Sequence, residues 1–542
     1  MSVVKSATTK TIVAPEAEKW VLVATISASS MASIGSSALN VALPALQRDL
    51  QVSGTELLWI VNAFALFLSA LILVGGSLGD HYGRKRIFTL GIILFSVASL
   101  ACGLAPNTFI LILARAVQGI GGALMVPGSL AILSASFPSD RRGAAIGLWS
   151  TFSALMIALG PVLGGWLASQ DLWRLVFFLN IPLAVVTLFA LTRVPESKDE
   201  SAPEELDTAG SLLATLALAG LTYSFIQAPE FGFDDWRIIT GLVAGAVLFA
   251  AFIVVEARSD HPLVPLRLFR SRTFSGANLL TLFLYGALGS TLFFLPLNLI
   301  QVQGYPEQIA GLTLLPFVLL LTLMSRWAGG LVDQIGARIP LTVGPIIAGV
   351  GVFLFALPGV TDGPQDFWLT FLPPILVLGL GMGITVAPLT TAVMGAAPEE
   401  SSGTASGINN AVSRSASVLA VAVLGAVALI SFKASLADST RDLGLPPAAQ
   451  TALDEEARDL GGAAVPDGLA PETAAEVSAA IKMSFVEAFR RVMVISAVLC
   501  WLSALLAAVL VEGKPHPQMA AKLRRVKLLF HDQGCPTVDH HG

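Results

Sequence analysis

The sequence predicts an all-α membrane protein whose helices cross a lipid bilayer many times. Hydrophobic residues make up 54% of the 542 residues, charged residues make up only 13%, and the mean hydropathy is +0.76. A soluble domain carries about 25% charged residues, so most of this chain must lie in lipid. The apolar runs lack the strict alternation of barrel strands. Because backbone polar groups in lipid must pair internally, α-helices are the expected spanning elements.

The hydropathy pattern divides the chain into fourteen expected membrane-spanning helices. A spanning helix needs about 20 mostly apolar residues. The expected spans cover residues 20–44, 57–79, 87–105, 108–132, 144–169, 172–192, 208–228, 237–257, 274–300, 308–332, 339–358, 367–392, 404–431 and 492–511.

Lysines and arginines predict the orientation of these helices. If the N-terminus lies inside, most of the 32 lysines and arginines fall in inner loops or at the chain ends, as membrane proteins require. Both termini are then cytoplasmic, which agrees with an even number of helices. Arg490 and Arg491 run against this pattern, because they flank the last expected helix on its outer side. The first apolar run is long enough to stay in the membrane, so no cleaved signal peptide is expected.

Two segments of the sequence repeat in the same order. "GSLGDHYGRKR" at 76–86 is echoed by "GGLVDQIGAR" at 329–338, and "RGAAIG" at 142–147 by "SGTASG" at 402–407. Pro127 and Pro388 each follow a glycine-rich run. The preserved order favours a true repeat over chance glycine matches. Helices 1–6 and 9–14 are therefore expected to form two similar bundles, with helices 7 and 8 inserted between them.

This repeat defines the expected organisation of the chain. Residues 1–193 form an N-terminal six-helix bundle, and residues 194–272 form a linker with two inserted helices. Residues 273–512 form a C-terminal six-helix bundle that includes a long outer segment, 432–490. Within that segment, "PPAAQTALDEEARDL" and "PETAAEVSAAIKMSF" are expected as two short helices around the loop "GGAAVPDG". Residues 513–542 form a basic cytoplasmic tail suited to an anionic inner leaflet.

Four motifs resemble the major facilitator superfamily, and most closely its fourteen-helix drug:proton antiporter branch. The motifs are "GSLGDHYGRKR" between helices 2 and 3, "LILARAVQGIGGA" at 111–123, "GPVLGG" at 160–165 and "LNVALP" at 39–44. Met156 stands where the helix 5 motif usually has a glycine. The resemblance implies a major facilitator fold and secondary active efflux of small amphiphilic compounds, of multidrug or metabolite type, by alternating access and coupled to protons. It also implies a monomer in the plasma membrane (the bacterial inner membrane), without cofactor, metal or nucleic acid partner.

Two of these motifs are expected to control the opening of the bundles. Asp80, with Gly83 and Arg84, is expected to reach backbone N–H groups at a helix start near "SSGTASG" in the other bundle and so latch the inner side. Asp333 occupies the matching position in the repeat. A set of small residues in helix 5 is expected to let two helices approach closely: Gly160, Pro161, Gly164 and Gly165. The alternatives are a pure topology signal for the first motif and plain packing for the second.

Three arginines stand at mid-depth in the expected spans, where no aspartate, glutamate or histidine does. A charge at this depth costs about 2.5–3.5 kcal/mol, so each is a functional candidate. Asn410 and Arg414 are four residues apart and share a helix face. Alternatively, Arg115 bonds backbone carbonyls and Arg326 lies near the inner end. The predicted cavity-lining residues are Asn40, Asn62, Arg115, Gln118, Arg326, Asn409, Asn410 and Arg414.

The expected proton-carrying carboxylates are missing. Proton-coupled members of the family usually carry an aspartate in helix 1 at the position of Gly35, and cation exporters carry acids in helices 2 and 13, where this chain has asparagines. An arginine does not lose its proton at any useful pH. The sequence therefore predicts neutral, zwitterionic or anionic amphiphiles as substrates rather than organic cations. Coupling through Asp80 or through a proton on the substrate remains open, as does an uncoupled facilitator or an exporter of anionic or lipid-like molecules.

Other classes of function fit the sequence less well. Uptake or facilitated passage of a metabolite is disfavoured only by the antiporter-like motif and the helix count. An intramembrane enzyme needs a nucleophile with a base, or a metal cluster, at mid-depth, and arginines with scattered amides supply neither. The three cysteines are scattered and indicate neither a disulfide framework nor a metal site. A channel is disfavoured by the two-bundle repeat.

Overall fold

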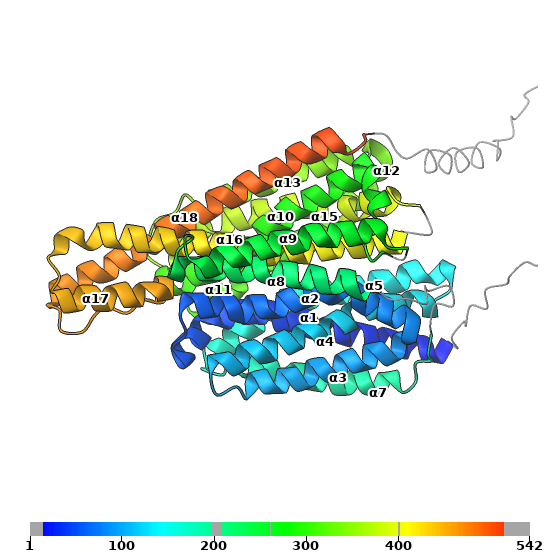
Figure 1. Cartoon of the computed structure of the whole chain (residues 1–542), viewed down its shortest axis with the longest axis horizontal. Helices are drawn as coiled ribbons and strands as arrows, with labels where there is room; N and C mark the ends of the chain where they lie inside the picture. The colour runs from blue at the N-terminus through cyan, green and yellow to red at the C-terminus, as the bar shows by residue number, and fades with distance from the viewer. Residues whose placement is uncertain (1–14, 198–206, 261, 399–401, 514–542) are drawn as a thin grey trace, which may run out of the picture.

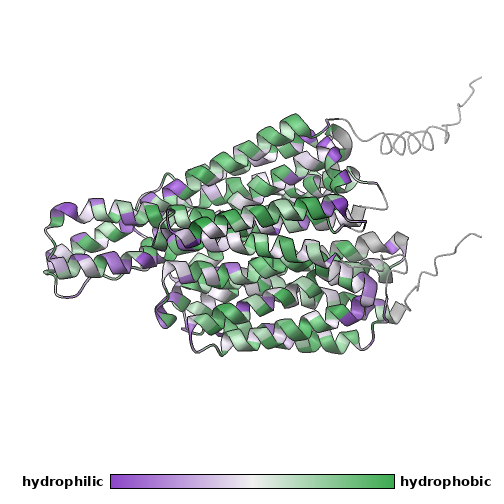
Figure 2. Ribbon diagram, in the orientation of Figure 1, coloured by the Kyte–Doolittle hydropathy of each residue, from purple (hydrophilic) through white to green (hydrophobic). Residues whose placement is uncertain are grey.

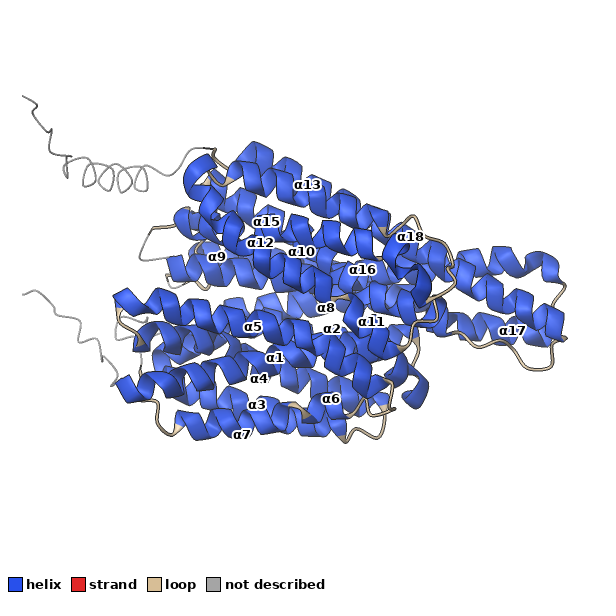
Figure 3. Cartoon of the chain, turned by 180° about the vertical axis from the view of Figure 1, so that it is seen from behind, coloured by secondary structure: helices blue, strands red, loops and turns tan. Residues whose placement is uncertain are grey.

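The computed structural model describes residues 15–197, 207–260, 262–398 and 402–513, and this part of the chain is helical without strands (Figure 3). The predicted all-α fold is therefore confirmed. Eleven described helices are long and apolar enough to cross a membrane. Shorter apolar helices, Leu155–Ala168, Leu175–Leu191 and Arg338–Leu354, lie where the three remaining spans were expected. The count of fourteen stays a prediction.

The helices before residue 193 form the N-terminal bundle. Two of them begin with a side-chain cap: Ser53 and Glu56 form a reciprocal capping box at the start of α2, and Asn107 caps α4. The helices are α1 (Pro15–Leu50), α2 (Gly54–Tyr82), α3 (Arg84–Gly103), α4 (Thr108–Ser136), α5 (Ser139–Ala168), α6 (Leu175–Phe178) and α7 (Asn180–Leu191).

Two helices follow as a hairpin, and the remaining ones form the C-terminal bundle. The hairpin consists of α8 (Thr208–Phe231) and α9 (Trp236–Arg258). The other elements are η1 (Leu266–Arg270), α10 (Arg272–Leu297), η2 (Asn298–Val302), α11 (Glu307–Thr313), α12 (Leu315–Ile335), α13 (Arg338–Leu354), η3 (Pro364–Asp366), α14 (Phe367–Thr370), α15 (Leu372–Gly395), α16 (Ser402–Thr440), η5 (Arg441–Leu443), α17 (Pro447–Glu456), η6 (Ala457–Gly462) and α18 (Pro471–Leu510).

The two bundles repeat the same helix contacts. In the N-terminal bundle α4 packs against α2 and α3, and in the C-terminal bundle α15 packs against α12 and α13. The pairs α1–α5 and α1–α7 correspond to α10–α16 and α10–α18. This correspondence supports the repeat inferred from the glycine motifs. The hairpin lies beside both bundles, because α8 packs against α2 and α16 as well as α9.

The ends of the described chain lie at one end of the molecule, and α17 lies at the opposite end (Figure 1). We call these ends inner and outer, as the charge pattern predicts; the orientation in the membrane stays a prediction. Apolar residues cover most of the helices between the two ends, whereas hydrophilic residues gather near the inner loops and on the outer projection, which is formed by the end of α16, by η5, α17 and η6, and by the beginning of α18 (Figure 2). This distribution fits a bilayer around the two bundles and water around the projection.

Several expected spans are broken, and two expected helices are joined. The span 308–332 is divided into α11 and α12 near Leu314, just before Pro316, because proline favours a helix start and lacks a backbone donor. The expectation of a separate short helix at 471–485 is wrong. It continues without a break into the last span as α18, because no glycine or proline follows Pro471 inside that helix.

Candidate functional site

A seam between α2 and α16 joins the two bundles along their length. The stripes that face each other are marked by three pairs of positions: Leu58 with Gly425, Leu73 with Gly407, and between them Leu66 with Val418, which share one buried cluster with Leu218 of α8. Their numbering shows that the two helices run antiparallel. Residues four or seven positions apart on a helix share a face. Residues of α2 and α16 at that spacing from these positions therefore also face the seam.

Arg414 and Asn62 occupy this seam. Arg414 follows Gly407 by seven residues and precedes Val418 by four. Asn62 lies four residues from both Leu58 and Leu66, and it is 1% exposed. Asn62 and Arg414, two of the predicted cavity-lining residues, therefore stand on helix faces at the boundary between the bundles, and their role toward a substrate stays a prediction.

The Arg414 guanidinium has no partner among the described residues. Its Nε is buried without a hydrogen bond, and Arg414 forms no ion pair with another described residue. A buried charge that lacks a counter-charge is costly. The position is therefore suited to an anionic or hydrogen-bond-accepting group that arrives from outside the protein.

A polar cavity of about 210 Å³ lies within the C-terminal bundle between α10, α15 and α16, on a face of α16 next to the one that carries Arg414. Asn409 lies in its wall and donates hydrogen bonds to Thr281 Oγ1 at 2.7 Å and to Asn278 Oδ1 at 3.2 Å. Asn410 is exposed, and its amide donates to the Ser406 carbonyl. The lining residues are Tyr285, Val386, Leu389, Thr390, Val393, Ser406, Asn409, Asn410 and Ser413. Two of the predicted asparagines thus face one cavity, one turn before Arg414.

Arg115 and Gln118 lie inside the N-terminal bundle instead. Both are almost fully buried, at 2% and 0% exposure. The Arg115 Nη1 donates to Gln118 Oε1 at 2.6 Å, and its Nε donates to the Ile60 carbonyl. The guanidinium also lies 4.4 Å from the centre of the Phe64 ring. All these partners are uncharged, so Arg115 is solvated by the protein, and its role toward a substrate stays a prediction.

The Arg115 network extends to the position of the missing aspartate. Gln118 Nε2 donates to Ser99 Oγ at 2.7 Å, and Asn180 Nδ2 donates to the same oxygen at 2.9 Å. A Cβ on Gly35 would lie 3.5 Å from Asn180 Nδ2. Gly35 therefore faces a network of neutral amides that ends at Arg115. Sequence reasoning missed Asn180 and Ser99, because only the fold brings them together.

The structure does not bring the remaining lining candidates together. Asn40 is half-buried on α1 and forms no hydrogen bond with another described residue. The side chains of Arg326 and Asp333 lie outside the described residues. Their predicted roles therefore stay predictions.

The inner motif is tied to its own bundle. Asp80 Oδ1 accepts a hydrogen bond from Arg84 Nε at 2.6 Å, and Gly83 has a φ of +111°, which favours glycine. Glu196 accepts from the backbone N–H of Lys85 at 2.9 Å. No described contact joins Asp80 to α16. The latch between bundles therefore stays a prediction, and Glu196, unnoticed in the sequence, braces the loop.

The "GPVLGG" motif packs on two sides of α5. A Cβ on Gly160 or Gly164 would lie 1.8 Å from Ser37 Oγ or 2.1 Å from the Ala38 carbonyl oxygen, so this side touches α1. On the other side, a Cβ on Gly165 would lie 2.2 Å from the Glu307 carbonyl oxygen. The Pro161 carbonyl likewise meets α11 of the other bundle at Gly311. The expected close approach is present, both within and between bundles.

A segment of the outer projection also touches the N-terminal bundle. Gln47 Nε2 donates to the Asp459 carbonyl of η6, and Gln301 Nε2 donates to Gln47 Oε1 at 2.7 Å. Burial, and then the nearby Glu456 and Glu56 carboxylates, raise the pKa of Asp459 to about 6. The outer side of the molecule is thus closed by α5–α11 contacts and by η6.

A sequence model described as the Major Facilitator Superfamily matches residues 25–421. The "Multidrug resistance protein Stp" of Mycobacterium tuberculosis is 36% identical over 404 residues, which cover 73% of each chain. The "Tetracenomycin C resistance and export protein" of Streptomyces glaucescens is 31% identical over 461 residues, covering 84% of this chain and 85% of that one.

Among solved structures, the chain resembles a bacterial homologue of the human lysosomal transporter Spinster, in an inward-facing and unoccupied conformation. The TM-score is 0.62 at 17% identity, over 93% of this chain and all of the other. Similarity at this level of identity concerns the fold alone.

Proposed function

The chain belongs to the major facilitator superfamily, and from this premise we propose that it is a proton-driven secondary transporter that exports small amphiphilic compounds across the plasma membrane. The efflux function rests on relatives named for drug resistance and export, at more than 30% identity over most of both chains. Two similar bundles, closed against each other on the outer side, suit alternating access around a site between them.

The single observation that carries the substrate class is Arg414. Its guanidinium lies on the seam between the bundles without a described counter-charge. A neutral, zwitterionic or anionic amphiphile can offer an oxygen acceptor to this group, whereas an organic cation is repelled by it. Asn409, Asn410 and the apolar wall of the adjoining cavity would then hold the polar and apolar parts of such a compound.

An uncoupled facilitator is the second candidate, and a specific observation favours it. Gly35 replaces the carboxylate that proton-coupled relatives carry, and it faces neutral amides. Coupling therefore requires a carboxyl elsewhere, or a proton carried by the substrate itself. An imposed pH gradient separates the two candidates, because only the coupled transporter accumulates substrate against its own gradient.

The proposal is tested by transport in inverted membrane vesicles that contain the full chain. Three fluorescent amphiphiles of matched size, one anionic, one neutral and one cationic, are supplied with and without an imposed pH gradient. We expect accumulation of the anionic and neutral probes that collapses when the gradient is dissipated. Strong transport of the cationic probe alone would overturn the substrate class. Transport at the same rate and extent with and without the pH gradient would show that the chain is an uncoupled facilitator.

A further inference from the structure

Two acidic side chains meet in the inserted hairpin, at its inner end. Asp207 caps α8, and its Oδ1 accepts a hydrogen bond from the Gly210 backbone N–H at 2.7 Å. Glu256 lies near the end of α9 and is only 2% exposed. Its Oε2 accepts from the Val264 backbone N–H at 2.9 Å, so the carboxyl is held in place.

The second oxygen of each carboxyl is buried and has no hydrogen-bond donor. Asp207 Oδ2 and Glu256 Oε1 lack any partner in the described part of the chain. They share one small space, because a Cβ on Gly210 would lie 2.8 Å from the first and 2.6 Å from the second. Two adjacent acceptors without a donor are costly to bury. A single proton placed between them would satisfy both.

No described cation offsets the charge of this pair. Neither carboxyl forms an ion pair with another described residue, whereas Asp80 on the neighbouring α2 already pairs with Arg84. The charged residues that follow α9 are exposed: Asp260, Arg267 and Arg270. The charged and titratable described residues on the surrounding elements are Glu56, Asp80, His81 and Tyr82 on α2, Tyr223 and Glu230 on α8, Arg237 and Arg258 on α9, Asp260 after it, Arg267 and Arg270 in η1, and Arg414, Lys433 and Asp438 on α16.

We propose that Asp207 and Glu256 hold one proton between them and form the proton-binding site of this transporter. Two carboxylates whose buried, donorless oxygens share one small space cannot both stay ionised at low cost near neutral pH, so the pair binds and releases a proton as a unit. The inference rests on the proposed proton coupling and locates it. It assigns to the inserted hairpin the proton-carrying carboxyl that helix 1 lacks at Gly35.

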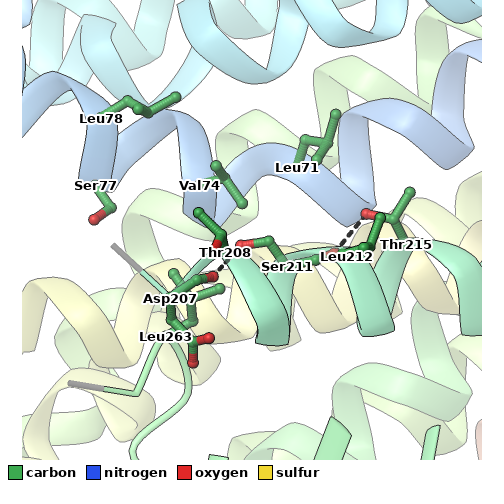
Figure 4. A pocket seen from close by; sticks show the side chains of 10 residues that line it. All are labelled: Leu71, Val74, Ser77, Leu78, Asp207, Thr208, Ser211, Leu212, Thr215 and Leu263. Atoms are coloured by element: carbon green, nitrogen blue, oxygen red, sulfur yellow. Dashed lines mark hydrogen bonds between the residues drawn. The ribbon is translucent and has the colours of Figure 1, made fainter. Parts of the chain in front are cut away.

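The surroundings of the pair connect its protonation to the movement of the bundles. Asp207 borders an apolar cavity of about 390 Å³, across which α8 faces α2 (Figure 4). The residues labelled there on α2 are Leu71, Val74, Ser77 and Leu78. Because α8 packs against both α2 and α16, loss of the proton places two like charges at the inner end of the hairpin that contacts both bundles. A site whose proton affinity differs between two conformations couples the proton to the change.

The proton is tested directly by infrared difference spectroscopy on the purified full chain in lipid nanodiscs, without any drug. We expect a protonated-carboxyl band at neutral pH that disappears in alkali. Glu256→Gln and Asp207→Asn should each remove it, since the proton belongs to the pair. Both amides preserve the size of the side chain and an oxygen for the existing backbone hydrogen bond. Asp260→Asn, an exposed neighbouring acid, should leave the band unchanged. A band that persists in both amide variants, or is absent from the unmodified chain, overturns the proposal.

The link to transport is tested in proteoliposomes with the neutral amphiphilic probe. We expect Glu256→Gln to lower accumulation driven by a pH gradient at least about tenfold. Downhill efflux of the same probe should continue. Equal accumulation by the variant and the unmodified chain would overturn the coupling role. Failure of the unmodified chain to move any probe would instead count against the proposed export function, and the infrared result would be unaffected by it.

Discussion

Arg48 on α1 and Glu307 on α11 form an ion pair that joins the outer ends of the two bundles. The Arg48 side chain is 58% exposed and the Glu307 side chain 15%. A pair this open to water contributes only about 0.2–1 kcal/mol. Directly beside it, the backbones of α5 and α11 touch, because Gly165 lies against the Glu307 carbonyl and Gly311 lies against the Pro161 carbonyl. The closed outer side therefore depends more on this backbone contact than on the ion pair.

Gly311→Ala should disrupt outer closure. Its Cβ would lie 2.1 Å from the Pro161 carbonyl oxygen, and the atom it meets is backbone and cannot rotate away. We expect transport to fall at least about tenfold, as expected for an overpacked helix contact that costs about 1–3 kcal/mol. The distance between the outer ends of the bundles should also increase, as measured between spin labels on Gln170→Cys and Asp362→Cys.

Gly359→Ala is the matched control for this substitution. No atom lies within 4 Å of the Cβ that it would add in an outer loop. It should leave both the transport rate and the spin-label distance unchanged. Full activity with an unchanged distance in Gly311→Ala would show that the outer side does not need this contact.

Arg48→Gln should have a much smaller effect. Because the ion pair is worth at most about 1 kcal/mol, the balance between closed and open outer sides should shift by less than about fivefold. The effect should shrink further in high salt, which screens exposed charges. A loss of transport as large as that of Gly311→Ala would reverse the ranking of these two contacts.

The sequence was informative wherever a local pattern determines the outcome. Helix positions follow from hydropathy, and the small residues of "GPVLGG" predict close packing without naming the partner. Gly160 and Gly164 of that motif pack against α1, and Gly165 packs against α11. The helix that each face of α5 contacts can be identified only when the positions of the neighbouring helices are known.

Depth along a helix was a poorer guide to the site, because it does not tell which way a side chain points. Arg115 and Arg414 both stand at mid-depth in the expected spans, yet Arg115 is enclosed by Gln118 and Phe64 and Arg414 lies on the seam. The contact of Gln47 with η6 joins residues more than 400 positions apart. Neither periodicity nor composition records such a pairing.

Arg414→Ala should remove the preference for acceptor-bearing substrates. Without the unpartnered guanidinium, the anionic probe loses a charge-assisted interaction that the neutral probe uses less. We expect transport of the anionic probe to fall about tenfold or more relative to the neutral probe. Arg414→Lys keeps the charge and should retain part of the preference. Equal losses for both probes would mean that the arginine supports the fold of the seam instead of the substrate.

Acid on the outer side should favour the closed arrangement. The pKa of Asp459 is raised by burial from 3.8 to about 6 in the contact with the N-terminal bundle. A raised pKa means that the closed arrangement binds the proton more tightly than one in which Asp459 faces water. Its favourable contribution is therefore fully present below 3.8 and is lost as the pH rises through about 6.

The same spin-label pair measures this dependence. The population with close outer ends should increase as the pH falls from about 7 to about 4, and Asp459→Asn should flatten that part of the curve. Asp442→Asn changes an acid on the same projection for which no such contact with the N-terminal bundle is described, and it should leave the curve as it is. A pH dependence that survives in Asp459→Asn would assign it to another group.

Gly35→Asp should convert the substrate preference toward organic cations. There is room for the first side-chain atom, since its nearest neighbour would be Asn180 Nδ2 at 3.5 Å. The new carboxylate would face the amide network that ends at Arg115, whose donors can support a negative charge. We expect export of a cationic probe that the unmodified chain moves poorly. Gly35→Asn adds nearly the same volume without the charge and should not confer it. If both substitutions behave alike, space at this position decides the outcome, and the absence of a carboxylate in helix 1 does not explain which substrates this transporter accepts.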